Sequence, residues 1–132
     1  MNSSTINSAT QLTGRVLMSF IFIMAGISKI GAYAATQGYM ESVGVPGILL
    51  PAVILLEVVG GMAVLLGWHT RIAALLLAGF SIVSAVIFHA NFADQIQMIL
   101  FMKNFAMAGG LLFLVAGVTH NWSIDGKRNT NK

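Results

Sequence analysis

Cysteine is absent from the 132 residues, and charged residues make up only 8% of them. The first absence excludes disulfides, thiolate metal sites, iron–sulfur clusters and thiol redox chemistry performed by this chain alone. The second is unlike a soluble domain, in which about 25% of the residues are charged. Hydrophobic residues account for 57% of the chain, more than a core of this size can bury. The composition therefore predicts a protein whose solvent is the lipid bilayer.

The apolar residues gather in four segments, each about as long as a membrane span of roughly 20 residues. The segments cover residues 12–33, 48–67, 71–89 and 96–119. Backbone groups in lipid must be satisfied within the segment, so each is expected to be a helix. The sequence predicts an all-α integral membrane protein, an antiparallel four-helix bundle over residues 12–119. We expect residues 1–11 to be a flexible tail and residues 120–132 a polar tail.

Two links between the segments carry further information. The link GWHTR, residues 67–71, is so short that the helices on either side must be antiparallel neighbours. The first link is longer and contains TQGYMESVG, residues 36–44, followed by Pro46. Tyr39, Met40 and Val43 can share one face of a helix there. We therefore expect a short helix at the membrane interface in this link.

Lysine and arginine predict the orientation, because cytoplasmic loops of membrane proteins carry an excess of both. Four spans place both termini and the second link on one side of the membrane. That side holds Arg15, Arg71, Lys127, Arg128 and Lys132, and the other holds Lys29 and Lys103. We expect cytoplasmic termini. The net charge of +3 comes from these positions and needs no nucleic-acid partner.

Charged residues lie on the same helix faces as small residues. Arg15, Ser19, Phe22, Gly26 and Lys29 recur at spacings of four and three on the first segment, which places them on one face. In the second segment Glu57, Gly61 and Val64 share a face, and in the fourth Lys103, Ala106 and Gly110 do so. Small residues allow close helix approach in membranes. We therefore expect the charged faces to point at other helices.

Glu57 is an acidic residue in the middle of an apolar segment, about 14 Å from either end. A lone charge at the centre of a membrane helix costs about 2.5–3.5 kcal/mol on insertion scales. The carboxyl group is therefore expected either to pair with Lys29 or Lys103, or to be protonated and neutral.

Four stretches together resemble the DoxX family of small four-helix bacterial inner-membrane proteins. They are GRVLMSFIFIMAGISKI (14–30), YMESVGVP (39–46), LLEVVGGMAVLLGWHTR (55–71) and FMKNFAMAGG (101–110). The resemblance implies a multi-pass protein of the bacterial inner membrane associated with oxidoreduction, in some members with quinone-linked systems. The family's recurring polar positions carry over to Arg15, Lys29, Glu57, Lys103 and Asn104.

A quinone head group would suit such a cluster, because it is a planar ring with two carbonyl acceptors and its reduction consumes protons. Lys29, Lys103 and Asn104 are the candidate hydrogen-bond donors, and Phe22 and Phe105 the candidate ring neighbours. Glu57 or His89 could exchange protons, as general acid–base groups do. Arg15 completes the set of candidate binding residues. The alternative is a buried ionic network that only fixes helix register.

Other functional classes find less support in the sequence. Two histidines that hold a haem must face each other at one depth, and only His69 and His120 fall on the same side. Neither a metal site nor a covalently bound cofactor is predicted. A transport cycle would require oligomerisation of so small a bundle, so a second copy is a candidate partner. The second functional hypothesis is a non-catalytic anchor or assembly subunit for a redox partner.

Overall fold

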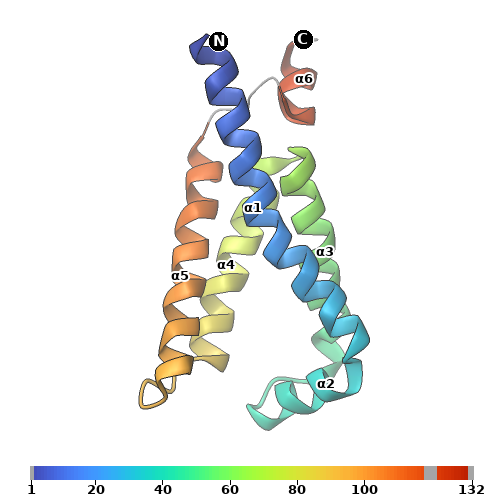
Figure 1. Cartoon of the computed structure of the whole chain (residues 1–132). Helices are drawn as coiled ribbons and strands as arrows, with labels where there is room; N and C mark the ends of the chain where they lie inside the picture. The colour runs from blue at the N-terminus through green and yellow to red at the C-terminus, as the bar shows by residue number, and fades with distance from the viewer. Residues whose placement is uncertain (1, 118–121, 131–132) are drawn as a thin grey trace.

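The computed structural model of the chain describes residues 2–117 and 122–130, and within them the regular structure is entirely helical (Figure 1). Four helices are long and apolar enough to cross a membrane. They are α1 (Ser3–Gly31), α3 (Leu50–Leu66, extended at its start by the 3-10 turn η1, Gly47–Leu49), α4 (Thr70–Phe88) and α5 (Gln95–Ala116). The four-helix prediction is confirmed. The expected short helix in the first link is α2 (Tyr33–Ser42).

The helices form two tightly packed pairs, α1 with α3 and α4 with α5, which are joined mainly through contacts between α3 and α4. Both chain termini and the α3–α4 turn lie at one end of the bundle, which we call the termini end (Figure 1). The opposite end, the α2 end, holds α2 and the α4–α5 loop (Figure 1). The two pairs separate toward the α2 end.

Glycines bring α1 and α3 together. A Cβ atom added at Gly26 would lie 2.6 Å from Val58 Cγ2, and one added at Gly61 would lie 2.7 Å from Ile23 Cγ1. The predicted inward faces of both helices are therefore confirmed. On α1 the structure buries Arg15, Ser19, Phe22 and Gly26, and on α3 it buries Glu57, Gly61 and Val64, among others.

The first helix begins nine residues before the predicted span. The Asn2 side chain caps it by accepting a hydrogen bond from the Thr5 N–H at 2.8 Å, and Ser8 is buried. Residues 3–11, predicted as part of a flexible tail, are helical. At 29 residues the helix is about 43 Å long, so it extends beyond the hydrocarbon layer of about 30 Å. Its polar first turns are the part that projects.

The predicted C-terminal tail also contains structure. Residues 118–121, including the end of the predicted fourth span and His120, lie outside the described residues. After them comes α6 (Ile124–Thr130). The Asp125 carboxylate accepts hydrogen bonds from the N–H groups of His69 and Thr70 and from Thr70 Oγ1, at 2.8–2.9 Å. Asp125 therefore caps the N-terminus of α4, where the N-cap residue His69 makes no capping hydrogen bond through its own side chain. This contact explains why part of the predicted tail is ordered.

Arg15 completes the junction at the termini end. The side chain is buried, with 2% of its surface exposed. Its guanidinium donates to the carbonyls of Leu65 at 3.1 Å and Val64 at 3.5 Å, and to the Trp122 carbonyl at 2.5 Å. The first two carbonyls belong to the last turn of α3, where carbonyls have no i+4 partner within the helix; the Val64 carbonyl also accepts from the Gly67 N–H at 3.2 Å. We call the contacts of Arg15 and Asp125 the terminal clasp.

Candidate functional site

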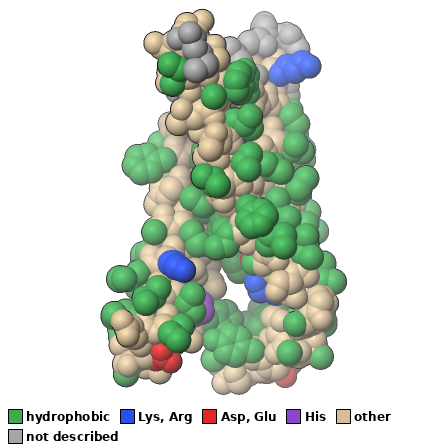
Figure 2. All heavy atoms as spheres, in the orientation of Figure 1, with side chains coloured by type: hydrophobic (Ala, Val, Ile, Leu, Met, Phe, Trp, Pro, Cys, Tyr) green, Lys and Arg blue, Asp and Glu red, His purple; other side chains and the backbone are tan. Residues whose placement is uncertain are grey.

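A cavity of about 510 Å³ opens between the two helix pairs toward the α2 end. Figure 2 shows the molecule hollowed between two limbs at this end. All five helices from α1 to α5 contribute to its walls, which are mostly apolar. Its volume falls within the range of about 300–1,000 Å³ typical of small-molecule sites.

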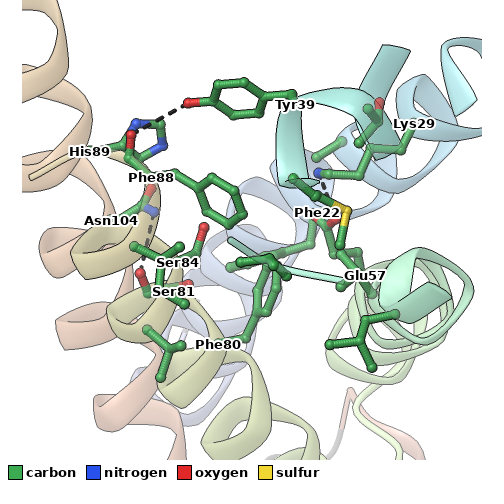
Figure 3. A pocket seen from close by; sticks show the side chains of 18 of the residues that line it. Phe22, Lys29, Tyr39, Glu57, Phe80, Ser81, Ser84, Phe88, His89 and Asn104 are labelled. Carbon is green, nitrogen blue, oxygen red and sulfur yellow. Dashed lines mark hydrogen bonds and ion pairs between the residues drawn. The ribbon is translucent and has the colours of Figure 1, made fainter. Parts of the chain in front are cut away.

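One wall of the cavity carries an ion pair between α1 and α3. Lys29 Nζ lies 2.6 Å from Glu57 Oε1 (Figure 3). The Glu57 side chain is 3% exposed, whereas that of Lys29 is 29% exposed. Glu57 is buried because the backbone of α1 comes close at Gly26, where an added Cβ would lie 3.3 Å from Glu57 Cβ. Of the two lysines that the sequence offers to Glu57, the structure places Lys29 beside it.

The opposite wall is built from α4 and α5, and it carries polar side chains but no Lys, Arg, Asp or Glu. The Asn104 amide donates to the Ser81 carbonyl at 3.2 Å, and the Ser81 hydroxyl donates to the Leu77 carbonyl at 2.8 Å. Ser84, one turn further along α4, also lines the cavity. In the part of the chain that the structure describes, no hydrogen bond of the Ser84 hydroxyl is found. Its hydroxyl and the Asn104 carbonyl oxygen are therefore free to meet a ligand.

Aromatic rings line the cavity between the two walls, and one of them lies across its α2 end. Phe22, Phe80 and Phe88 line the cavity together with Tyr39 (Figure 3). The Tyr39 and Phe88 rings stack at a centroid distance of 5.5 Å, and the Tyr39 hydroxyl donates to the Phe88 carbonyl at 3.4 Å. Tyr39 thus bridges α2 and α4 across the α2 end. Gln37 holds α2 in place by donating to the Gly47 carbonyl at 3.1 Å.

His89 lies at the end of α4 and lines the same cavity. Its Nδ1 atom is 2.8 Å from Gln97 Oε1 on α5. This contact orients the ring and leaves Nε2 for a ligand or water. The other described histidine, His69, belongs to the α3–α4 turn at the termini end, and the remaining one, His120, is not described.

The structure brings together five of the predicted site residues and separates three from them. Phe22, Lys29, Glu57, His89 and Asn104 line the cavity. Arg15 does not, because its guanidinium belongs to the terminal clasp. Its place is about 21 Å along α1 from Lys29. Arg15 therefore lies outside this cavity.

The rotation of α5 about its own axis places Lys103 and Phe105 outside the cavity. Successive helix residues point about 100° apart, and Asn104 faces the cavity, so its two neighbours face outward. Lys103 is exposed, and Phe105, 41% exposed, stacks on Phe101 at 4.7 Å. The prediction that Lys103 and Ala106 face other helices is therefore wrong, because both are exposed, whereas Gly110 of the same predicted face does contact Met18 of α1. Asn104, Met107, Ala108 and Leu111 lie on the inward face of α5.

Several residues that line the cavity are not predicted from the sequence: Tyr39 as a lining residue, Phe80, Ser81, Ser84, Phe88 and Met107. A signal for two of them was present. Ser81 and Ser84 are the only polar side chains between Ile72 and Phe88, and three residues apart they share a helix face. The aromatic residues had no such signal, because phenylalanine is ordinary in a membrane helix.

Comparison with known proteins agrees with this architecture. The DoxX family profile matches residues 10–90, well over half of the chain. The chain belongs to the DoxX family. It is 50% identical over 114 residues to the inner membrane protein YqjF of Escherichia coli K12, covering 86% of this chain and 88% of that protein. With the four apolar helices, this shows a multi-pass inner-membrane protein.

Two further relatives are more distant. The inner membrane protein YphA of Escherichia coli K12 is 34% identical over 110 residues, covering 78% of this chain and 79% of that protein. A Bacillus subtilis protein named "Putative oxidoreductase CatD" is 32% identical over 73 residues, covering 55% of this chain and 54% of that protein. No solved structure matches the chain.

Proposed function

We propose that this DoxX-family protein is a membrane component of a redox system and that its cavity binds a quinone or a similar aromatic head group. The observation that carries the proposal is the cavity itself, in which aromatic side chains lie between two polar walls. An apolar pocket with a few convergent polar groups is typical of small-molecule sites. The oxidoreductase name of the relative CatD adds support for redox chemistry.

In this proposal each wall holds one end of the ring. Lys29 uses one N–H for Glu57 and offers the others to a ring oxygen. Ser84 and Asn104 can donate to a quinone carbonyl or accept from a quinol hydroxyl at the other end. Phe22 and Phe80 flank the ring faces, and Glu57 exchanges protons through Lys29. Electrons come from a separate redox protein.

Ligand binding can be tested with a benzoquinone that carries two methoxy groups and a methyl group but no tail. We expect saturable binding to the purified protein and about tenfold weaker binding to Ser84→Ala, which loses one hydrogen bond worth about 1.4 kcal/mol. Isothermal titration calorimetry in detergent micelles measures both affinities. The matched control is Ser28→Ala, an exposed serine on α1 outside the cavity, which should bind as the parent does. Absence of saturable binding to the parent would contradict the proposal.

The alternative is that the chain is a non-catalytic anchor or assembly subunit in which the Lys29–Glu57 pair only fixes the register of α1 against α3. The burial of Glu57 beneath α1 is the observation that favours it. A stable soluble partner that co-purifies with the protein, together with failure of the quinone titration, would support this role.

We also propose that the termini end faces the cytoplasm, so that the cavity lies toward the periplasm. The distribution of lysine and arginine supports this orientation. Because the chain has no cysteine, a single cysteine reports the side of the membrane directly. Ala93→Cys, in the exposed α4–α5 loop, should react with a membrane-impermeant maleimide added to spheroplasts. Ser4→Cys, exposed at the start of α1, should react only after permeabilisation, and the reverse pattern would contradict the orientation.

A further inference from the structure

The cavity has a side opening between α1 and α5. At the termini end these helices touch, since a Cβ added at Gly110 would lie 2.5 Å from Met18 Cε. Over their whole lengths α1 and α5 make far fewer contacts with each other than α1 makes with α3 or α4 with α5. Further toward the α2 end, Ile21 and Ala25 of α1 and Met107 of α5 line the cavity. Figure 2 shows this hollow on the face where α1 and α5 lie in front in Figure 1.

The opening lies at the height of the hydrocarbon layer. Ile21 is ten residues before the end of α1 at Gly31, which is about 15 Å along the helix axis. Its side chain is 46% exposed and belongs to a helix apolar enough to span the membrane. Lipid tails, not water, therefore meet the rim of this opening.

The end of the cavity that faces water is more obstructed. Tyr39 crosses from α2 to α4 and stacks on Phe88, and Gln37 ties α2 to the start of α3. The polar groups of the two walls, Lys29 with Glu57 and Ser84 with Asn104, line the same cavity as Tyr39. A molecule that reaches them by the side opening passes apolar side chains only.

From this geometry we infer that the ligand is an uncharged amphiphile dissolved in the membrane, with a planar polar head in the cavity and an alkyl or isoprenoid tail leaving between α1 and α5. The inference rests on the proposed aromatic site and adds the tail, its exit and the entry route from lipid. Ile21, Ala25 and Met107 contact the start of the tail. A water-soluble head without a tail fills only the inner part of the site.

The test compares two probes, the tail-free dimethoxy-methyl benzoquinone and the same head with a ten-carbon alkyl tail. Ile21→Trp narrows the opening without touching the polar walls. We expect it to weaken binding of the tailed probe by about tenfold or more and to change binding of the tail-free probe by less than about twofold. Met107→Phe, from the opposite rim, should show the same selectivity. The matched control Leu17→Trp, 70% exposed on α1 and outside the cavity, should affect neither probe.

The outcomes separate the two proposals. If the parent binds the tail-free probe but neither rim variant discriminates between the probes, the side exit is wrong and the aromatic site stands. If the parent binds neither probe, both proposals are wrong. If both rim variants weaken binding of the tailed and the tail-free probe equally, the tail does not leave between α1 and α5.

Discussion

Replacing Arg15 with alanine should lower the free energy of unfolding by about 3 kcal/mol. The substitution removes charge-assisted hydrogen bonds to three carbonyls, each worth about 1.5–3 kcal/mol in a buried setting. It also leaves the Leu65 carbonyl at the end of α3 without the Arg15 donor and removes a cation near Asp125. Part of the loss is recovered, because the charge no longer has to be desolvated. Denaturation in mixed detergent micelles, followed by circular dichroism, measures the change.

The control for this prediction is Arg71→Ala, which removes an exposed arginine at the same end of the bundle. Its effect should stay within about 0.5 kcal/mol, as for most surface substitutions. Arg15→Lys should fall between the two, since an ammonium cannot reproduce the planar fork of a guanidinium. If Arg15→Ala unfolds at the same denaturant concentration as the parent, the terminal clasp does not stabilise the fold.

Arg15 also shows what the sequence reveals and what it leaves open. Its spacing with Ser19, Phe22 and Gly26 predicts correctly that it faces other helices, because a helix fixes relative directions along its own axis. The spacing cannot say which groups it meets. Its partners are backbone carbonyls of α3 and of Trp122, and backbone groups leave no pattern in a sequence. The same holds for Asp125, whose cap on α4 is made 55 residues away from Thr70.

The rotation of α5 was harder to predict than that of α1 or α3. Apolar residues occur on every side of α5, so its hydrophobic pattern does not define an inward face. The sequence predicts an inward Lys103 because Lys103 shares a helix face with the small residues Ala106 and Gly110, but its neighbour Asn104 lines the cavity instead. Packing against α4 determines which of these adjacent residues faces inward, and the sequence pattern of α5 alone does not specify that packing.

Breaking the Lys29–Glu57 pair should lower the free energy of unfolding by unequal amounts, depending on which partner is removed. Lys29→Met leaves a carboxylate that is 3% exposed without a counter-charge, and loss of one partner from a buried pair costs about 3–5 kcal/mol. Glu57→Gln leaves an ammonium that is 29% exposed and can be hydrated from the cavity, so we expect a cost of about 1 kcal/mol. Lys103→Met, the exposed lysine of α5, is the matched control and should cost less than about 0.5 kcal/mol.

The double variant Lys29→Met with Glu57→Gln then distinguishes a structural role of the ion pair from a role of Lys29 in ligand binding. It leaves no buried charge, so it should be more stable than Lys29→Met alone, with a coupling energy of about 2 kcal/mol in a double-mutant cycle. If Lys29 binds a ring oxygen, this stable variant should bind the tail-free benzoquinone about tenfold more weakly than the parent. Parent-like affinity in the double variant would mean that the pair fixes only the register of α1 and α3. Equal costs for the two single variants would instead mean that Glu57 is not an ionised partner of Lys29.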